Sequence, residues 1–417
     1  SPLSATQLVE NFFRHEYSRV VAMLARRVGM ADIALVEVAV QSTMMLALER
    51  WKVAGVPDQP TAWMYRVAYN AVIDALRKQA RQERILMKEA DLEHVASERD
   101  SESLQSWEVN DAMLRMLFVC CDDVLPAQSQ LIMALKTLCG FDTREIAQRL
   151  FISEENVYKR LGRARIVFRA QAEHFDQLGV EQYAARVPAV RNVIYTLFTE
   201  GYLSSRAEMA IRRELSTEAI RLATMLANHV VGQDPETFAL LALMHLHAAR
   251  MASRQTAAGD LLLLQEQDRS LWDWQMIETG LTWLAKSAEG DTFSRYHAEA
   301  GIAAEHCLAP SIEATNWERI AGYYEQIERQ SKSPIHRLNR AVAVAQWQGP
   351  AAGLAVLQDF EIPTWLAGSY MWHAVLADLH RRCGDKRKAL KYTELACAAA
   401  PSEAVRSLLL RRLQVDG

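Results

Sequence analysis

Apolar residues recur every three or four positions along most of the 417-residue chain, and this spacing predicts helices. In the first 88 residues it predicts three of them. The first spans Thr6 to Val28, where Gly29 ends it, and the second begins at Asp32 and runs to about Trp51. A loop with Gly55 and Pro60 follows, and Thr61 then caps a long third helix. Because residues 175–417 have the same helical spacing, the whole chain is predicted to be all-α.

The segment from Phe141 to Arg169 predicts two helices joined by a tight turn. Asp142 and Glu145 have the spacing of a capping box at the start of the first helix, and Ser153 caps the second. In that second helix, four apolar residues fall on one narrow stripe and are expected to face a core. They are Val157, Leu161, Ala164 and Phe168.

A polar stripe lies roughly a third of a turn from this apolar one. It consists of Asn156, Lys159, Arg160 and Arg163. A helix that enters the DNA major groove needs cationic side chains for phosphates and Arg, Lys or Asn for base edges. The stripe therefore predicts duplex DNA binding, although a solvated basic face on an ordinary surface helix has the same pattern.

The long third helix also carries a polar stripe, within an arc of roughly 60° at helical spacing. It consists of Arg66, Asn70, Arg77, Arg81 and Arg84. Trp63 and Tyr69 flank it, and aromatic rings beside Arg and Asn suit unpaired bases. Since the arginines would also follow phosphates, affinity should fall steeply with salt. For Trp63 alone, burial in a core is the simpler interpretation.

Composition limits these hypotheses. The chain has 47 basic and 51 acidic residues, so nucleic-acid binding must depend on local basic surfaces. No apolar run approaches the ~18 residues of a membrane span and no signal peptide opens the sequence, so no membrane partner is expected. Six cysteines without a Cys-x-x-Cys pair are interpreted as buried free thiols in the cytoplasm. Because phosphate-loop, nucleophile-elbow and zinc motifs do not occur, we expect no cofactor, no metal and no catalytic residue.

Two sets of residues resemble a known family, the bacterial extracytoplasmic-function (ECF) sigma factors. The region-two pattern is matched by Pro60, Trp63, Val67, Ala68, Asn70, Asp74 and Arg77. The region-four pattern is matched by Leu125, Pro126, Gly140, Glu145, Ile146, Ala147, Leu150, Ser153, Arg163, Ala164 and Arg165. The resemblance covers residues 1–172. The segments LRMLFVCCDDVLP and QEQDRSLWD, with the helical remainder, resemble a subgroup that has a long C-terminal helical extension.

The resemblance implies a sigma factor, not an enzyme, that brings promoter recognition and DNA melting to the RNA polymerase core. Its partners would be promoter DNA and the clamp and flap regions of the core. Region four would bind the minus-thirty-five element through Ser153, Asn156, Lys159, Arg160 and Arg163. Region two would capture unpaired minus-ten bases through Trp63, Arg66, Asn70, Arg77 and Arg81. Glu37 and Gln41, on the helix from Glu37 to Leu48, would bind polymerase.

The chain departs from the family pattern at three positions. Val38 and Ser42 stand where the family usually has acidic residues. If those acids form exposed charge pairs with the clamp, each loss costs about 0.2–1 kcal/mol. Phe151 stands in the turn where a small residue is common, and we expect its φ to remain negative.

The predicted domains are region two (1–88), an acidic linker (89–107), region four (108–172), a helical extension (173–309) and tetratricopeptide-like repeats (310–417). The linker has six acids and one base between residues 89 and 106, which is typical of a mobile tether. Gly349 and Gly384 recur at the spacing of helix hairpins. We expect this C-terminal half to bind an unknown protein or ligand and to regulate the sigma half in cis.

Two alternatives remain open. The first is a stand-alone helix-turn-helix regulator with a tetratricopeptide-like sensor domain, which would bind duplex DNA without polymerase. The second is an enzyme with a site at Glu266, Asp268 and Arg269. We prefer to interpret that cluster as a buried, salt-bridged corner that locks helices together.

Overall fold

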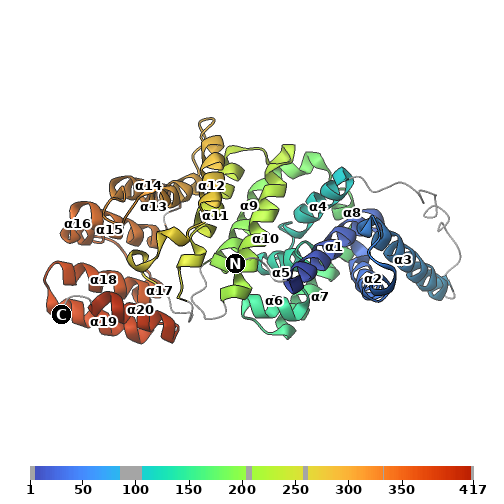
Figure 1. Ribbon diagram of the computed structural model, residues 1–417, viewed down its shortest axis with the longest axis horizontal. Coiled ribbons are helices and arrows are strands. Elements are labelled where there is room, and N and C mark those ends of the chain that lie inside the picture. Colours follow the sequence, from blue (N-terminus) through green and yellow to red (C-terminus); the bar gives the residue numbers. More distant parts are fainter. Residues whose placement is uncertain (1–4, 85–105, 203–208, 257–261, 332, 415–417) are drawn as a thin grey trace. The chain divides into compact units, whose positions relative to one another are not determined.

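The computed structural model describes residues 5–84, 106–202, 209–256, 262–331 and 333–414, which contain helices and no strand. The all-α prediction is therefore confirmed (Figure 1). The chain divides into two compact units, Ser1–Thr196 and Leu197–Gly417. The predicted acidic linker lies outside the described residues, except for Ser106 and Trp107, which begin a helix.

The first unit begins with three long helices, which Figure 1 shows in blue. They are α1 (Ala5–Val28), α2 (Ile33–Ala54) and α3 (Pro60–Arg84), with the short 3-10 helix η1 (Met30–Asp32) between the first two. Gly29 ends α1 as predicted, with φ of 96°. The predicted cap at Thr61 is wrong, because α3 already begins at Pro60 and the Thr61 hydroxyl instead donates to the Glu16 carboxylate.

Apolar side chains of these three helices form a common core. Val20 and Leu24 of α1, Val36 of α2, and Met64 and Ala68 of α3 are fully buried or nearly so. The centre of α3 thus faces this core. Ala71, one turn farther along the helix from Val67, is exposed.

Six further helices follow. The first five belong to the first unit, and the sixth crosses the division between the two units. They are α4 (Ser106–Cys120), α5 (Ala127–Thr137), α6 (Thr143–Leu150), α7 (Glu154–Ala170), α8 (Ala172–Asp176) and α9 (Val180–Tyr202). The division between the two units falls inside α9. Large side chains that are fully buried here include Phe118, Phe168 and Phe175.

The stretch Met30–Ala54, which contains α2, is long and apolar enough to cross a membrane by length and composition. In the structure Ile33, Val36 and Val40 on its inward side are fully buried against the other helices of the first unit. Other positions of α2, including Val38 and Met45, are exposed, so the helix is buried on one face only.

The second unit consists of helices packed on their neighbours in sequence. They are α10 (Met209–Ala227), α11 (Pro235–Ala248), α12 (Trp274–Ser287), α13 (Arg295–Leu308), α14 (Trp317–Ser331), α15 (Pro334–Gln348), α16 (Pro350–Val356), α17 (Thr364–Ala367), α18 (Tyr370–Arg382), α19 (Lys386–Ala399) and α20 (Glu403–Gln414). Short 3-10 helices are η2 (Val230–Gly232), η3 (Met251–Ser253), η4 (Leu264–Glu266) and η5 (Arg269–Leu271). Helix α11 packs on α12 and α13, α14 on α15, and α18 on α19. Gly349 and Gly384 follow helix ends with positive φ, as their spacing predicted.

The cysteines differ in their burial. Cys120, Cys121, Cys139 and Cys307 are buried as predicted. Cys383 is exposed and Cys397 is partly exposed, so the prediction of buried thiols is wrong at these two positions. Cys383 lies in the turn that follows α18 and Cys397 lies in α19, a part of the chain where fewer side chains are fully enclosed.

Candidate nucleic-acid interface

Helices α6 and α7 form the predicted pair joined by a tight turn. The Asp142 carboxylate accepts a hydrogen bond from the Glu145 amide (2.7 Å), which is the predicted capping box. The Ser153 hydroxyl accepts one from the Asn156 amide (3.1 Å) and caps α7. Phe151 corrects an expectation, because its φ is +53°. The turn therefore uses a left-handed residue that is not glycine, a conformation that costs about 1–2 kcal/mol.

The two faces of α7 are separated as the sequence predicted. Val157, Leu161, Ala164 and Phe168 are all buried. The opposite side carries a hollow of about 310 Å³. Its lining consists of Ser153, Glu155, Asn156, Lys159, Arg160 and Arg163. All five predicted region-four residues therefore line one concave, cationic surface.

Local contacts hold two of these side chains in place. The Arg160 Nε donates to the Asn156 Oδ1 at 2.7 Å, and the Lys159 ammonium pairs with the exposed Glu155 carboxylate at 2.7 Å. An exposed pair of this kind contributes little to stability, so phosphate oxygens can replace Glu155 at small cost. The arrangement suits a polyanion that approaches from solvent.

The predicted stripe on α3 is exposed. Arg66, Asn70, Arg77 and Arg81 all face solvent, and Arg77 lies 4.0 Å from Asp74 in a loose pair. Arg84 belongs to α3, but its side chain lies outside the described residues. The stripe is thus open to a ligand over the described length of the helix.

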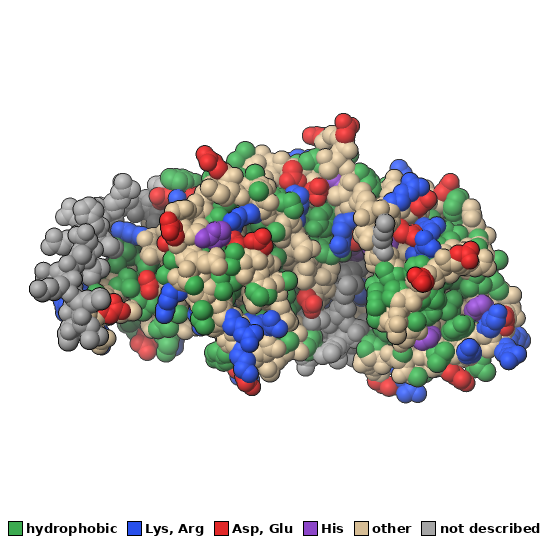
Figure 2. Space-filling model, turned by 180° about the vertical axis from the view of Figure 1, so that it is seen from behind, with side chains coloured by type: hydrophobic (Ala, Val, Ile, Leu, Met, Phe, Trp, Pro, Cys, Tyr) green, Lys and Arg blue, Asp and Glu red, His purple; other side chains and the backbone are tan. Residues whose placement is uncertain are grey.

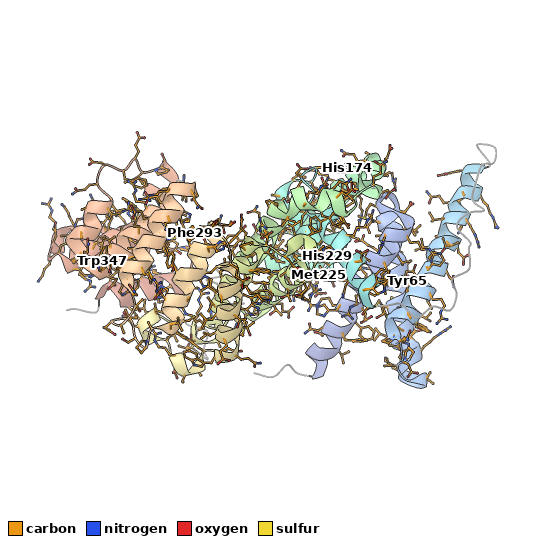
Figure 3. All side chains as sticks on the ribbon, turned by 90° about the horizontal axis from the view of Figure 1, so that it is seen from above. Tyr65, His174, Met225, His229, Phe293 and Trp347 are labelled. Carbon is orange, nitrogen blue, oxygen red and sulfur yellow. The ribbon has the colours of Figure 1, made fainter. Side chains whose placement is uncertain are left out.

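Tyr69, which the sequence placed beside this stripe, belongs to an aromatic and cationic cluster. Its ring stacks on the ring of Tyr65, which Figure 3 labels, with centroids 6.1 Å apart. The Arg27 guanidinium, from the last turn of α1, lies 4.2 Å from the Tyr69 ring centre and 3.3 Å from the Tyr65 hydroxyl. The spacing of four between the tyrosines was the available signal, but only the fold brings Arg27 to them. This flank offers stacking surface next to the cations.

Trp63 is partly buried and lies in a row of rings. Its ring meets the ring of Trp51 edge to face, with centroids 5.5 Å apart, and the ring of Trp51 stacks on that of Phe13, with centroids 5.9 Å apart. A hollow of about 380 Å³ opens beside this row, lined mainly by apolar side chains that include Phe12 and Val56. Trp63 thus takes part in a core, as the simpler interpretation expected, while it remains accessible at its edge.

The two candidate polymerase-binding residues point in different directions. Gln41 is exposed on α2, together with Val38 and Met45, whose side chains are 60% and 68% exposed. Glu37 is only 3% exposed, and its Oε2 accepts a hydrogen bond from Arg165 Nη2 of α7 at 2.6 Å. The outward face of α2 therefore presents apolar Val38 and Met45 beside polar Gln41.

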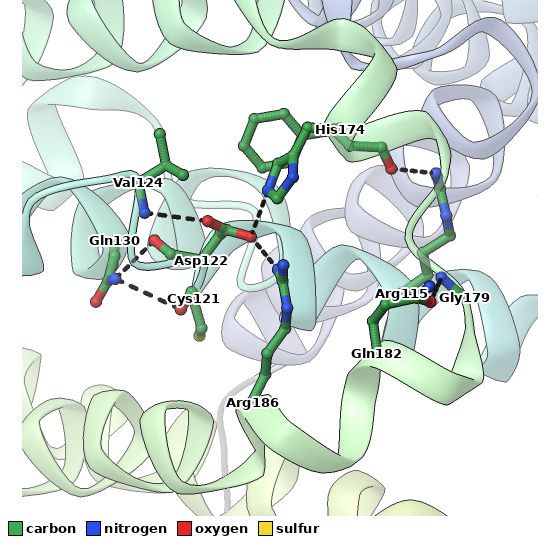
Figure 4. A network of polar contacts seen from close by, with 10 residues as sticks. Arg115, Cys121, Asp122, Val124, Gln130, His174, Gly179, Gln182 and Arg186 are labelled. Carbon is green, nitrogen blue, oxygen red and sulfur yellow. Dashed lines mark hydrogen bonds and ion pairs between the residues drawn. The ribbon is translucent and has the colours of Figure 1, made fainter.

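Asp122 is a buried polar centre that sequence analysis missed. Its carboxylate accepts hydrogen bonds from the Val124 amide (3.0 Å) and from Arg186, and it lies 3.1 Å from His174 Nε2 (Figure 4). Burial acts to raise the pKa of Asp122. The bonds from Val124, His174 and Arg186 outweigh it and hold the pKa below its usual value of 3.8. Asp122 thereby joins the end of α4 to α8 and α9.

The cluster around Glu266, Asp268 and Arg269 does not have the predicted geometry. Asp268 is exposed and caps η5, and its bonds to Ser270 lower its pKa. Glu266 pairs with Arg411 at 3.2 Å on the surface. The expectation of a buried salt bridge is therefore wrong, because both acids lie where water solvates them.

Arg269 joins the segments of this corner. Its Nη1 donates to the backbone carbonyls of His306 (3.1 Å) and Ala309 (2.7 Å), and its guanidinium lies 4.5 Å from the centre of the Trp272 ring. The Trp272 Nε1 donates to Ser253 at 2.8 Å. Hydrogen bonds to carbonyls at the end of α13 thus join these segments without an acidic partner.

The charge on the surface indicates that local cationic faces, and not the net charge of the chain, attract nucleic acid. On the face shown in Figure 2, basic, acidic and apolar side chains are interspersed. With a formal net charge of −4, the chain has no excess of positive charge to attract DNA at long range. The two cationic faces on α3 and α7 must supply the attraction.

Comparison with known families finds a match for each of the two segments that carry these faces. Residues 12–82 match Sigma-70 region 2, and residues 115–166 match Sigma-70, region 4. Residues 186–288 match DUF6596, a family of unknown function. The first match covers α3 up to residue 82, and the second covers α6 and α7 up to residue 166.

A relative shares the whole arrangement. An uncharacterized protein of Rhizobium meliloti (strain 1021) is 33% identical over 387 residues, which cover 92% of this chain and 90% of the relative. No solved structure matches the chain. Sigma-70 proteins act in transcription initiation with RNA polymerase core and promoter DNA. With regions 2 and 4 in order ahead of a helical extension, the chain belongs to the sigma-70 family.

Proposed function

We propose that the protein is an ECF-type sigma factor that binds the polymerase core, selects promoters and helps to open them. One observation carries the proposal. The cationic faces of α7 and α3 are both exposed, and they lie in the two segments that match sigma regions four and two.

The two faces differ in a way that supports different ligands. The α7 face is a concave cationic surface with an amide and three cations, which suits phosphates and base edges of a duplex. The α3 face has stacked aromatic rings beside its arginines, which suits separated bases. We infer that Ser153, Asn156, Lys159, Arg160 and Arg163 contact the minus-thirty-five element. Trp63, Arg66, Asn70, Arg77 and Arg81 would contact the minus-ten element.

Run-off transcription with purified core polymerase and genomic fragments tests this function. The expected result is specific transcripts that appear only when the protein is added, together with co-elution of protein and core. A protein that binds duplex DNA but neither co-elutes with core nor prefers non-template single strand would contradict the proposal.

That outcome would favour the second candidate, a stand-alone helix-turn-helix regulator. One observation supports it. Of the two polymerase-binding candidates only Gln41 is exposed, whereas Glu37 is buried against Arg165. Binding to a duplex alone, with no effect of the α3 arginines on affinity, is its expected signature.

We further infer that the second unit regulates the sigma regions in cis and acts in the cytoplasm. Gly349 lies in the turn between the packed helices α15 and α16, and Gly384 in the turn between α18 and α19. Such hairpins are compatible with a tetratricopeptide-like stack and a protein or ligand partner. Removing residues 203–417 tests the regulation. We expect promoter output or core affinity to change, and equal values in both assays would refute a regulatory role.

A further inference from the structure

Polar and charged side chains meet where the region-two helices pack on the region-four helices. Four residues form this seam. Tyr17 of α1, Glu37 of α2 and Lys136 of α5 are buried, and the side chain of Arg165 of α7 is 33% exposed. Glu37 pairs with Arg165 at 2.6 Å, and the Lys136 ammonium donates to the Tyr17 hydroxyl at 3.0 Å. Both polar contacts thus cross from one sigma region to the other.

The seam also has close steric contacts at its rim. Gly140, with φ of +71°, leaves so little space that a Cβ placed on it would lie 2.2 Å from the Arg14 carbonyl oxygen of α1. The Arg14 guanidinium lies 4.2 Å from the centre of the Phe141 ring. Helix α1 therefore fits region four closely, and the two regions form one body in this state.

The buried polar groups of the seam are incompletely satisfied. Glu37 Oε1 and Arg165 Nε make no hydrogen bond in the described part of the chain. Burial and the Glu37 charge raise the pKa of the Tyr17 hydroxyl, and burial lowers the pKa of Lys136 despite the nearby Glu37. On closing, Glu37 loses its hydration and Arg165 loses part of its own, so an apolar pair of similar size would hold the same interface more firmly.

We propose that the seam is a reversible lock between the two sigma regions, closed by Glu37 and Arg165. In the closed form Glu37 is withheld from solvent, while the α3 stripe and the cations Lys159 and Arg163 of α7 remain exposed. Opening rehydrates the charged groups and frees Glu37 for the polymerase core. This last step rests on the proposed sigma function, whereas the lock itself does not.

Cys120 provides a built-in reporter of the lock. Its side chain is fully buried on α4, it lies 3.1 Å from the Thr137 hydroxyl, and the Glu37 charge helps burial to raise its pKa to about 12. Alkylation of Cys120 therefore requires opening, whereas exposed Cys383 reacts in any state. The ratio of the two rates in the full chain, resolved by peptide mass spectrometry, measures opening independently of polymerase.

Two variants should shift the lock in opposite directions. Arg165→Gln leaves Glu37 buried without its cation, so Cys120 labelling should accelerate by about tenfold and core polymerase should bind more tightly. The double change Glu37→Leu with Arg165→Leu replaces the ion pair by apolar packing, so labelling should slow by about tenfold and core binding should weaken. The control is Arg169→Gln, in the exposed last turn of α7, which should change neither value.

The results separate the lock from the proposed function. If Arg165→Gln and the double variant label Cys120 at the wild-type rate, the lock is refuted, and circular dichroism establishes that each variant is folded. If labelling shifts in both directions but no variant, nor the wild type, binds core, the lock is established and the sigma function is wrong. If the two variants shift the rate of Cys120 labelling in opposite directions and core affinity shifts with it, the results support both the lock and the sigma function.

Discussion

At the scale of single residues, the candidate DNA contacts are already arranged in the free protein. Arg160 is held by Asn156, while Lys159 is held only by the exposed Glu155. An arginine that is positioned in advance loses less conformational freedom on binding a base edge. These local differences predict unequal effects of substitution along one helix face.

Alanine substitution on α7 should weaken duplex binding. For Arg163→Ala or Lys159→Ala we expect a loss of about 1–3 kcal/mol where the side chain contacts a base, with altered preference at that position. A residue that contacts only phosphate should instead lower the slope of log K against log salt by about one unit. Fluorescence anisotropy with a promoter duplex at several salt concentrations measures both. Arg169→Ala, on the same helix, is the matched control and should leave the slope unchanged.

Asn70→Ala should separate the two DNA activities. The Asn70 side chain is exposed on α3 beside the stacked tyrosines, in a position suited to an unpaired base. We therefore expect normal duplex binding but reduced open-complex formation, measured by permanganate reactivity of promoter thymines with core polymerase. Equal losses in both assays would contradict the assignment of α3 to single strands.

Asp122 should make the stability of the fold depend on pH. Because the folded pKa of Asp122 lies below 3.8, its charged form stabilises the fold above that pH, and this contribution is lost as the pH falls through the lower, folded value. Asp122→Asn should remove this part of the acid sensitivity and destabilise the fold at neutral pH by about 2–3 kcal/mol, since Arg186 loses its partner but is partly exposed. Calorimetric unfolding from neutral to acidic pH tests this. Parallel pH profiles of wild type and variant would exclude the role.

At the scale of elements, the helix-turn-helix shows what local sequence can specify. Both caps formed as predicted because Asp142, Glu145 and Ser153 satisfy backbone amides within three residues. The conformation of Phe151 was predicted wrongly. Phe151 is the C-cap of α6, where a left-handed residue lets its own amide and that of Ile152 donate to the Ala147 carbonyl. Glycine usually occupies such a position, so nothing in the sequence indicated it.

Two glycines with positive φ should respond very differently to alanine. A Cβ on Gly140 meets the Arg14 carbonyl at 2.2 Å, whereas nothing lies within 4 Å of a Cβ on Gly55. Gly140→Ala should thus destabilise the first unit by about 3 kcal/mol or more and accelerate Cys120 labelling, because strain and a steric clash add. Gly55→Ala should cost about 1 kcal/mol through φ alone. Chemical denaturation of both variants compares them, and similar losses would show that Arg14 moves aside freely.

At the scale of the whole molecule, the first unit includes more than the two sigma matches. Tyr183 stacks on Phe118 at 4.3 Å, Arg115 donates to the Phe175 carbonyl at 2.8 Å, and Arg186 bonds Asp122. The first turns of α9 thus complete the core of region four, although the family match to region four ends at residue 166.

This packing predicts where the chain can be shortened. A chain that ends at Asp176 loses Tyr183 and Arg186, which exposes Phe118 and leaves Asp122 buried with one donor fewer. We expect it to unfold at a clearly lower temperature than a chain that ends at Tyr202, by several degrees for each kcal/mol lost. Thermal unfolding of the two truncated chains is the measurement. Equal midpoints would show that α9 contributes nothing to region four.

Much of the fold and of the candidate site was predictable because it depends on periodicity. The buried stripe of α7, the exposed stripe of α3 and the ends of helices at Gly29, Gly349 and Gly384 follow from spacing within one element. Arg27 beside Tyr69 and Glu37 beside Arg165 were not predictable, since each joins residues far apart in sequence. Side-chain spacing within a helix carries no information on which other helix it will meet.

The amino-acid sequence alone determined that this chain is helical, that two of its helices present cations and amides to a ligand, and which family pattern those residues match. Only the tertiary structure decided that Glu37 faces inward, that Asp122 ties three segments together, and that the two sigma regions share one body. The physical reason is the range of the interactions. Helix formation and amphipathicity depend on neighbours three and four residues away, whereas burial of a charge depends on partners that only the folded chain brings within hydrogen-bonding distance.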